Sequence, residues 1–513
     1  MDACLLGIDA GNTMIKAVLF DLRGRVLAVA ERGGATHQPR PGYAERPLAD
    51  IYQGATQAIR DCLARAAIDP ARVIAVGAAG HGNGLYALDQ AGKPLIGIQS
   101  IDGRAAGLVR ELERSGLAAA IYQRCLQKPW AAATPVLLSW LKRHQPELYR
   151  RIGTVLFAKD VIGHFLSGVA SGEVSDAAGS GLLSYRTRQY DAELMALYDL
   201  ADALPLLPVL RESCDIRGHV SARAARLTGL PPGIPVVAGI FDVVASAIGS
   251  GVVHTGEASI VAGTWSINQV VVDAPDYRRP VFMNSIIERD RYMAIEASAT
   301  SAANLDWFIR EFDDGRDGGG AARCSASVAA VKPSAQLPLY HPYLYSGRKE
   351  GPAKAGFYGL NGWHTRADML FALFEGVTFA HRAHIDRLRA AGIPFTRATL
   401  SGGAARSHIW PQMFANVLGI PLRVTDCSET GALGAAICAG VGVGVYADMS
   451  AGVAHAVTLN PAEYLPDASL HAFHSSRYRL FKRLELAMNG LWEEEDDDQP
   501  ASNPAREGTN LLL

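Results

Sequence analysis

The chain has 513 residues, of which 49% are apolar, and its 49 Lys and Arg residues almost balance its 51 Asp and Glu residues. That length suits about two to four domains of roughly 150 residues each. The near-neutral charge lacks the basic surface that binding to nucleic acid or an anionic membrane requires, so we expect neither partner. Seven scattered cysteines without a CxxC pair, no signal-like start and no apolar run of about 18 residues predict a cytoplasmic protein with reduced thiols.

Short apolar runs and glycine-rich turns alternate with helical patterns in the first half of the chain. The expected strands lie at 5–8, 15–20, 26–30 and 73–78, and the expected helices at 48–67, 131–144 and 160–166. The first two strands are joined by Ala-Gly-Asn-Thr, whose turn chemistry predicts a strand–turn–strand unit. The mixture of strands and helices predicts the α/β class.

The second half opens in the same manner. The expected strands lie at 235–238, 258–262, 268–272 and 398–400, and the expected helices at 243–248, 367–391 and 409–417. The hairpin at 258–272 has a Gly-Thr turn like that of the first hairpin, which indicates a weak internal duplication, although any hairpin can look this way. We expect a surface loop at 313–336, which is rich in Gly, Ala and Ser, and a disordered acidic tail at 491–513.

The turn of the first hairpin carries polar side chains suited to phosphate. Asp9 ends the first strand, and Gly11, Asn12 and Thr13 form the turn that leads to Lys16. Backbone N–H groups in such a turn, together with a hydroxyl and an ammonium group, can hold phosphate oxygens. A carboxylate at the strand end can hold Mg²⁺ through its water shell. The alternative is an ordinary β-turn that uses Asp and Gly for its backbone geometry.

Three later segments offer related chemistry. Gly263 and Thr264 form a turn that is either a second phosphate clamp or a plain hairpin turn. The segment Ser401-Gly402-Gly403-Ala404 follows a strand, and its glycines let a flat ring or a phosphate approach the backbone. Its spacing matches neither GxxxxGK[ST] nor GxGxxG. Asp242 ends a strand and begins a helix, so it is either a helix N-cap or a carboxylate at the ligand-binding end of an α/β sheet.

In this order, the four motifs resemble those of the FGGY carbohydrate kinases, which belong to the actin/hexokinase superfamily. The segment 355–375 follows the family's C-terminal signature, and 429–436, Glu-Thr-Gly-Ala-Leu-Gly-Ala-Ala, looks like its late Gly/Ala helix near the nucleotide. The resemblance covers roughly residues 4–490. It departs from the family pattern at Leu373, where a smaller residue or Ile, Val or Met is usual, and at Leu137, where Lys is usual.

The resemblance implies two RNase-H-like domains, at 1–251 and 252–490, with a cleft between them. It implies ATP and Mg²⁺ as cofactors, with Asp9 at the metal and Asp242 as the catalytic base. The phosphate- and nucleotide-binding residues that it implies are Gly11, Asn12, Thr13, Lys16, Gly263, Thr264, Ser401, Gly402, Gly403 and Ala404.

The substrate loops differ from the common family pattern. Where many members have Ser-Gly-Gln-Met-His-Gly, this chain has Ala-Gly-His-Gly-Asn-Gly, so His81 stands in place of Gln and Asn83 in place of His. Asp102 and Arg104 match the family's Asp-x-Arg beside the sugar, and we expect Asp102 to accept two hydroxyls while Arg104 orients it. Asp242 is expected to contact the substrate as well. Gly-His-Gly-x-Gly-Leu-Tyr together with Gly-Thr-Trp-Ser-Ile-Asn resembles the L-xylulose kinase branch.

These features predict ATP-dependent phosphorylation of a small sugar or polyol hydroxyl, with a ketopentose such as L-xylulose as substrate. Erythritol or another polyol is the alternative, since erythritol kinases share the first of these two patterns. A chaperone-like or actin-like ATPase and a non-catalytic sugar-binding regulator are the alternatives from other classes. Asp102 and Arg104 argue against the first, and the retained Asp9 and Asp242 argue against the second. The predicted partner is a small molecule, with a homodimer left open.

Overall fold

The computed structural model of the chain describes residues 3–312, 320–345 and 353–497. It divides into two compact units, and each is built from segments that are distant in sequence. The first unit comprises Met1–Thr255, Val271–Ala294 and Glu429–Thr458, and the second comprises Gly256–Val270, Ile295–Ser428 and Leu459–Leu513. The sequence places the domain boundary at 251/252 and assigns 429–458 to the second domain, whereas the contacts of these residues group them with the first unit.

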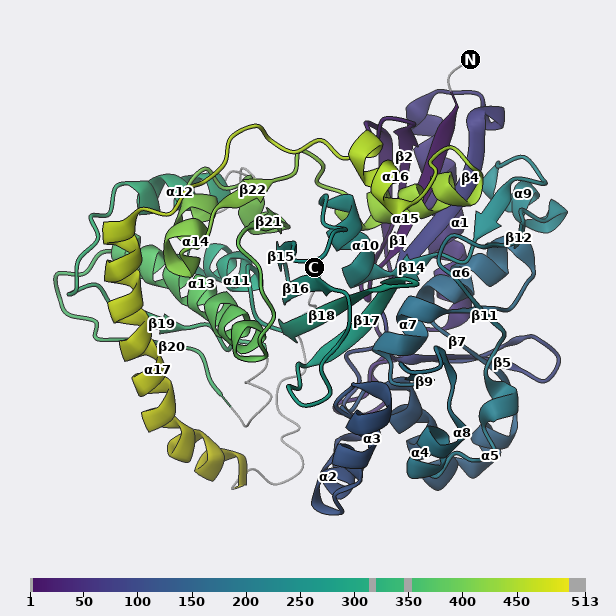
Figure 1. The fold of residues 1–513 in the computed structure, drawn as a ribbon, viewed down its shortest axis with the longest axis horizontal. Coiled ribbons are helices and arrows are strands. Elements are labelled where there is room, and N and C mark those ends of the chain that lie inside the picture. Colours follow the sequence, from purple (N-terminus) through teal and green to yellow (C-terminus); the bar gives the residue numbers. More distant parts are fainter. Residues whose placement is uncertain (1–2, 313–319, 346–352, 498–513) are drawn as a thin grey trace. The chain divides into compact units, whose positions relative to one another are not determined.

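A mixed sheet forms the centre of the first unit (Figure 1). Its strands run in the order β12 (Ile216–His219), β13 (Pro235–Val237), β4 (Val73–Gly80), β1 (Cys4–Ala10), β2 (Met14–Asp21) and β3 (Val26–Gly33), and β14 (Ile240–Phe241) also pairs with β4. β1, β2 and β3 form an antiparallel meander, and β4 lies parallel to β1. The four strands expected at 5–8, 15–20, 26–30 and 73–78 are therefore present as β1 to β4. Each of these apolar runs is bounded by turn residues.

Glycine lets one helix pack unusually close to this sheet. α15 (Thr430–Gly442) is rich in Gly and Ala and lies against β1 and β4. A Cβ on Gly7 of β1 would lie 2.0 Å from the carbonyl oxygen of Ala432, and a Cβ on Gly77 of β4 would lie 2.0 Å from that of Ala435. No larger residue fits at either strand position, because the clash would be with backbone. This contact is why residues 429–458 belong to the first unit.

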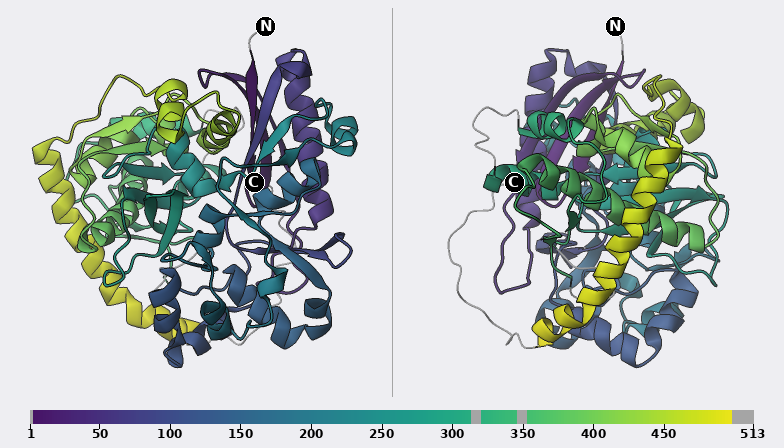
Figure 2. Two further views of the ribbon diagram at one scale, coloured as in Figure 1. Left: turned by 45° about the vertical axis from the view of Figure 1, so that its right-hand side comes forward. Right: turned by 90° about the vertical axis from the view of Figure 1, so that its left-hand side faces the viewer.

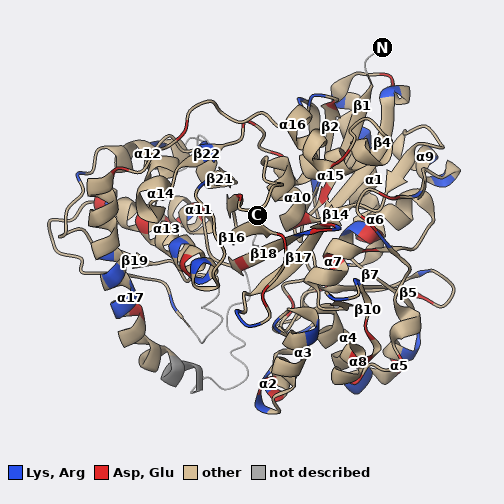
Figure 3. Cartoon of the chain, viewed as in Figure 1, with Lys and Arg blue, Asp and Glu red and all other residues tan. Residues whose placement is uncertain are grey.

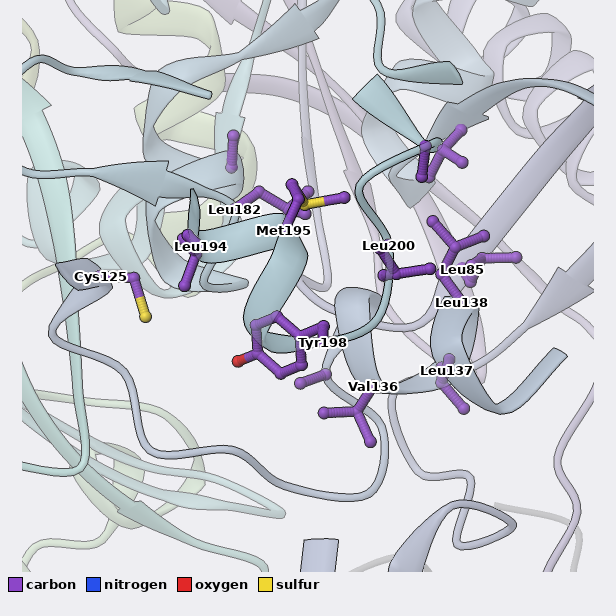
Figure 4. Close-up of a cluster of buried hydrophobic side chains, with 14 of the residues drawn as sticks. Leu85, Cys125, Val136, Leu137, Leu138, Leu182, Leu194, Met195, Tyr198 and Leu200 are labelled. Atoms are coloured by element: carbon purple, nitrogen blue, oxygen red, sulfur yellow. The ribbon is translucent and has the colours of Figure 1, made fainter. Parts of the chain in front are cut away.

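A second layer of the first unit has its own apolar core around the small sheet β6–β5–β7 (Figure 4). Val136, Leu137, Leu194, Met195 and Tyr198 are among its buried side chains. The remaining elements of the unit are α1 (Leu48–Ala66), η1 (Pro70–Arg72), β5 (Leu85–Asp89), β6 (Pro94–Ile98), α2 (Ala106–Arg114), α3 (Leu117–Cys125), α4 (Thr134–His144), α5 (Pro146–Arg150), β7 (Ile152–Leu156), α6 (Ala158–Ser167), β8 (Gly172–Glu173), α7 (Val174–Gly179), β9 (Leu183–Ser184), β10 (Gln189–Tyr190), α8 (Ala192–Leu197), η2 (Leu204–Leu206), β11 (Leu210–Arg211), α9 (Ala222–Thr228), α10 (Asp242–Gly249), β17 (Met283–Glu288) and α16 (Met449–Ala456).

The second unit repeats the local topology of the first. β15 (Ala258–Ala262) pairs antiparallel with β16 (Ser266–Val272) and parallel with β21 (Ala398–Ser401), as β1 does with β2 and β4. This shared strand arrangement agrees with the weak duplication expected from the sequence. The other elements are β18 (Arg291–Ser298), at which the chain enters the unit, α11 (Ala303–Phe312), α12 (Gly320–Ala329), β19 (Leu339–His341), β20 (Gly356–Tyr358), α13 (Arg366–Ala390), η3 (Gly403–Arg406), α14 (Trp410–Leu418), β22 (Leu422–Val424) and α17 (Ala468–Asp497).

Two expectations about irregular segments were wrong in part. The predicted loop at 313–336 contains α12, because its Ala-rich stretch forms a helix that buries Cys324 and Val328. The predicted tail at 491–513 begins inside α17, which is one long helix through Asp497 (Figure 2, yellow), and Trp492 is buried against Tyr343. Residues 313–319 and 498–513 lie outside the described residues. Within the described part of the chain, no helix has both the length and the apolar character needed to cross a bilayer.

Candidate active site

Two carboxylates of the first unit lie where neighbouring strands of the central sheet end. Asp9, near the end of β1, pairs in register with Ala79 of β4, and Ile240 of β14 pairs with Ala79 from the other side. Two residues after Ile240, Asp242 begins α10, with Phe241 at the N-cap position. Asp242 is therefore not the N-cap that the sequence left as an alternative. Both carboxylates lie at the edge of the sheet where β1, β4 and β14 end.

Burial perturbs both carboxylates. It raises the pKa of Asp9 to about 6, with Lys16 opposing the shift and Glu429 adding to it. The pKa of Asp242 is raised well above its ordinary value, first by burial and then by the negative charges of Asp9 and Asp176. Two neighbouring acids that resist ionisation together are a common feature of sites that hold a cation or accept a proton.

The glycine-rich start of α15 shapes the space beside Asp9. A Cβ on Gly431 would lie 2.5 Å from Asp9 Oδ2, so a larger residue would displace the carboxylate. Lys16 lies opposite Asp9 on β2, and its ammonium donates to Glu429 Oε2 at 3.0 Å. The phosphate-binding lysine expected from the sequence is thus one-third exposed and already paired with a carboxylate.

The predicted phosphate turn is tied to a neighbouring loop by its polar groups. Asn12 donates through Nδ2 to Ser100 Oγ at 2.9 Å, and its carbonyl oxygen accepts from Gln99 Nε2 at 2.6 Å. Gly11 is half-buried and Thr13 is exposed. Gln99 was not anticipated from the sequence, because it precedes the recognised Asp-x-Arg segment and has no motif of its own.

The loop with the unusual His and Asn lies next to this edge of the sheet. The backbone N–H of His81 donates to the carbonyl oxygen of Ala10 at 3.0 Å, which joins the loop to the end of β1. His81 Nε2 is 2.8 Å from Tyr86 Oη, and burial lowers the pKa of His81 to about 4. His81 Nδ1 and Asn83 Oδ1 are buried without a hydrogen-bond partner. Unpartnered buried polar atoms are costly, and a water or a ligand that hydrogen-bonds to them would remove that cost.

Asp102 and Arg104 form a buried ion pair, which we call the clasp. Asp102 Oδ1 accepts from the backbone N–H and Nε of Arg104, and Oδ2 accepts from Arg104 Nη2 and from the backbone N–H of Ala44 at 2.6 Å. Arg104 also donates to Glu45 Oε1 at 2.7 Å, and the side chains of Asp102 and Arg104 are fully buried. The structure therefore differs from the expectation that Asp102 offers two oxygens to substrate, because each oxygen already accepts hydrogen bonds within the protein.

The predicted nucleotide segments come together within the second unit. The turn after β15 contains Gly263 and Thr264, and the carbonyl oxygen of Gly263 accepts from the backbone N–H of Ala302 at 2.8 Å. Gly402 has a φ of 85°, and a Cβ on it would lie 2.7 Å from the carbonyl oxygen of Ala262. Only glycine permits both this backbone conformation and this close approach.

Space remains open beside these segments. A Cβ built on Gly263 would meet no atom within 4 Å, and one on Gly403 would meet its first neighbour at 3.9 Å. Ser401 is buried and its Oγ has no hydrogen-bond partner, while Ala404 is fully buried. The helix expected after the glycine pair is a short 3₁₀ helix, η3, before α14 begins at Trp410. Exposed backbone beside open space suits a phosphate or a flat ring.

The chain matches known carbohydrate kinases over most of its length. Residues 4–249 match the N-terminal domain of the FGGY family of carbohydrate kinases, and residues 258–443 match its C-terminal domain. The protein belongs to this family. It is 33% identical to a probable L-xylulose kinase of Pasteurella multocida, over 95% of this chain and 99% of that protein. It is 32% identical to the L-xylulose/3-keto-L-gulonate kinase of Escherichia coli, over 95% of this chain and 97% of that protein.

A solved relative has the same fold. The crystal structure of a xylulose kinase from Rhodospirillum rubrum is 26% identical, with a TM-score of 0.85, and the match covers 95% of this chain and 99% of that one. The two-domain FGGY kinase fold and sugar phosphorylation as the class of activity are therefore established for this chain. Family membership also disfavours the chaperone-like and actin-like ATPase alternative.

One charged cluster of this sugar kinase was missed by sequence analysis. Lys159, in the first turn of α6, has its ammonium 3.0 Å from Asp176 Oδ2, 3.2 Å from Asp160 Oδ1 and 3.5 Å from Glu173 Oε2, and all four side chains are fully buried. Arg217 adds a second cation, 3.3 Å from Asp160. Figure 3 shows opposite charges side by side on α6. The signal in the sequence was a Lys-Asp pair inside an otherwise apolar helical run.

Asp176 connects this cluster to the site. Burial raises its pKa to about 8, against the opposing effect of Lys159. It is one of the two negative charges that raise the pKa of Asp242, and its Oδ1 lies against the loop of His81 and Asn83, where a Cβ on Gly82 would be 2.8 Å away. Lys159 responds in the opposite sense: burial alone would lower its pKa, but the three carboxylates outweigh burial and raise it.

Proposed function

We propose that the protein transfers the γ-phosphoryl group of ATP to a hydroxyl of a ketopentose, with L-xylulose as the preferred substrate. The observation that carries the proposal is the pair of partly buried carboxylates, Asp9 and Asp242, at one edge of the sheet beside the unpartnered polar atoms of His81 and Asn83. The names of the relatives from Pasteurella multocida and Escherichia coli support the choice of L-xylulose.

In this proposal Asp242 accepts the proton of the attacking hydroxyl. The hydroxyl oxygen forms a bond to the γ-phosphorus, the bond from that phosphorus to the bridging oxygen breaks, and ADP leaves. In its ionised form, a carboxylate whose pKa is raised by burial is a more basic proton acceptor than one in water. The rest of the catalysis is positioning and charge neutralisation, which phosphoryl transfer chiefly requires.

Asp9 is the proposed contact to Mg²⁺, which would supply charge neutralisation at the phosphates. The residues fit that ion: Mg²⁺ keeps several waters and needs only one or two carboxylates. Among the described residues no group of three or more His, Cys, Asp or Glu side chains could hold a metal. The raised pKa of Asp9 also fits, because a cation would offset the burial that raises it.

The nucleotide is assigned to backbone-rich segments. We assign the phosphates to the turn Gly11-Asn12-Thr13 with Lys16 and to Gly263 with Thr264, and the adenosine to Ser401-Gly402-Gly403-Ala404. Support comes from the open space at Gly263 and Gly403 and from the unpartnered Ser401 Oγ. Lys16 would exchange part of its contact with Glu429 for a phosphate oxygen.

For the sugar we assign direct contacts to His81, Asn83 and Asp242. Asp102 and Arg104 take the role of a clasp that holds the segment at Ala44 and Glu45, because both oxygens of Asp102 already accept hydrogen bonds and Arg104 already donates to Asp102 and Glu45. A site built on fixed donors and acceptors rejects analogues that lack a matching hydroxyl.

The cytoplasmic location and the homodimer stay predictions.

A coupled assay of ADP release tests the proposal. The panel contains L-xylulose, other pentuloses, 3-keto-L-gulonate, erythritol, glycerol and a hexulose, each with Mg·ATP. We expect the highest kcat/KM for L-xylulose. Erythritol as the best substrate would favour the polyol alternative, and higher kcat/KM for glycerol or the hexulose than for every pentulose and tetritol would overturn the assignment.

A further inference from the structure

A neutral polar network lies beneath the turn of the second hairpin. Ser266 Oγ lies 3.1 Å from His381 Nδ1 and 3.2 Å from His384 Nδ1, and Asn268 Oδ1 lies 2.9 Å from His381 Nδ1. Asn268 Nδ2 lies 2.8 Å from His384 Nδ1, and Ser301 Oγ lies 2.9 Å from His381 Nε2. Four of these five side chains are fully buried, and His384 is nearly so.

With the amide of Asn268 oriented as the structure has it, one pattern of protons satisfies both nitrogens of His381. Nδ1–H donates to the amide oxygen of Asn268, so Nε2 carries no hydrogen and accepts from the hydroxyl of Ser301. The amide N–H of Asn268 donates to His384 Nδ1, which must then be an acceptor. Both rings are neutral in this pattern, and burial lowers the pKa of His381 to about 3, so it stays neutral throughout the physiological range.

This network reaches both ends of the turn that contains Gly263 and Thr264. At one end His381 and His384 contact Ser266, the first residue of β16. At the other end His381 contacts Ser301, and the next residue, Ala302, donates its backbone N–H to the carbonyl oxygen of Gly263 at 2.8 Å. A single imidazole on α13 therefore braces the turn from both sides.

We propose that His381 is a positioning residue that sets the backbone geometry of the turn at Gly263 and Thr264, and through it the affinity for the nucleotide. The proposal rests on the proposed function, in which this turn holds a phosphate group. His381 itself is buried and touches no nucleotide, so its effect passes through Ser266 and Ser301. Preorganised backbone donors bind an anion better than a turn that must be ordered on binding.

Three substitutions at one position test this assignment. We expect His381→Ala to raise the KM for ATP and the dissociation constant for ADP by about tenfold, a change typical of losing buried hydrogen bonds, with the KM for the sugar changed less than about twofold. His381→Asn places an amide where Nδ1 was and keeps the contact to Asn268. His381→Gln places one where Nε2 was and keeps the contact to Ser301. We expect each amide to recover part of the loss.

A buried histidine of the same unit serves as the matched control. His474 on α17 is buried, and its Nδ1 lies 2.7 Å from Glu375 Oε1. We expect His474→Ala to lower the thermal midpoint of unfolding without changing the affinity for ADP. If His381→Ala fails to fold, the Asn and Gln variants decide, because each retains one half of the network.

The outcomes separate this inference from the proposed function. Variants of His381 that lower the thermal midpoint but bind ADP as the wild type does would overturn the positioning role, as would an equal rise in the KM for sugar and for ATP. ADP binding by calorimetry needs no sugar substrate. If the wild type phosphorylated no sugar in the panel, the proposed function would fail while the calorimetry still decided the role of His381.

Discussion

Replacing Lys159 by Met should destabilise the first unit severely, since it removes the cation from a cluster of buried carboxylates. At an effective dielectric constant of about 20, each contact between the Lys159 ammonium and an ionised carboxylate of the cluster is worth roughly 5 kcal/mol of attraction, against a desolvation cost of several kcal/mol for the ammonium. Met fills a similar volume, so packing is largely kept. Removing one partner of a buried pair typically costs about 3–5 kcal/mol, and we expect Lys159→Met to fall in this range.

The loss should depend on pH in a defined direction. The pKa of Asp176 is raised to about 8 in the folded protein, so the folded state holds this proton more tightly than the unfolded state does. Stability from this group is fully present below the ordinary pKa of an aspartate and is lost as pH rises towards about 8. Removing Lys159 raises the pKa of Asp176 further and extends the loss to higher pH. Up to about pH 8 Asp176 is protonated in both folded proteins, so the cost of Lys159→Met should be similar at pH 5 and 7 and larger at pH 8.5.

Urea unfolding at pH 5, 7 and 8.5 measures this effect, with Lys142→Met as the matched control. Lys142 is partly exposed and lies 2.8 Å from Asp202, a surface pair that should contribute no more than about 1 kcal/mol. The reasoning would be refuted if Lys159→Met cost no more than Lys142→Met, or if its cost were the same at all three pH values.

Three further substitutions test individual roles. Asp242→Asn should lower kcat by at least about 10²-fold while ATP binding stays nearly unchanged, as loss of a general base predicts, and wild-type turnover would contradict that role. Asp9→Ala should raise the Mg²⁺ concentration needed for half-maximal activity, whereas superimposable Mg²⁺ titrations would remove Asp9 from the metal site. Asp102→Ala should lower the free energy of unfolding by about 3 kcal/mol, because it leaves Arg104 buried with only Glu45 as a counter-charge. A drop in kcat/KM at unchanged stability would instead restore Asp102 as a direct sugar contact.

Local patterns predicted the parts of the fold that depend on neighbours in sequence. The two hairpins and their Gly-containing turns follow from apolar runs bounded by turn residues, and the positions of Asp9 and Asp242 at strand ends followed with them. The position of α15 could not be predicted in this way. Its Gly and Ala residues allow close packing, but they do not indicate which strands the helix packs against. Its contact with Gly7 and Gly77 joins residues more than 350 positions apart and is visible only in the fold.

Sequence reasoning also failed to predict the burial and the partners of charged residues in apolar surroundings. The sequence analysis gave Lys159 and Asp160 no role, and the structure buries both side chains fully, where Glu173, Asp176 and Arg217 from other segments supply charged partners. Which charge pairs with which is a tertiary property. The same holds for Asp102, where a motif match identified the residue but not the clasp that occupies its oxygens.

The two turns assigned to phosphate are supported by networks of opposite character, and the difference follows from their chemistry. In the proposed mechanism Asp9 and Asp242 act as carboxylates that bind a cation and accept a proton, and buried charges lie nearby, among them the pair of Lys159 with Asp176. In the same proposal the turn at Gly263 binds an anion, and a buried carboxylate beneath it would repel phosphate. A brace built from neutral His, Ser and Asn side chains around His381 supplies rigidity without negative charge. Rigidity and electrostatic neutrality are needed together there, and an imidazole that donates and accepts at once provides both.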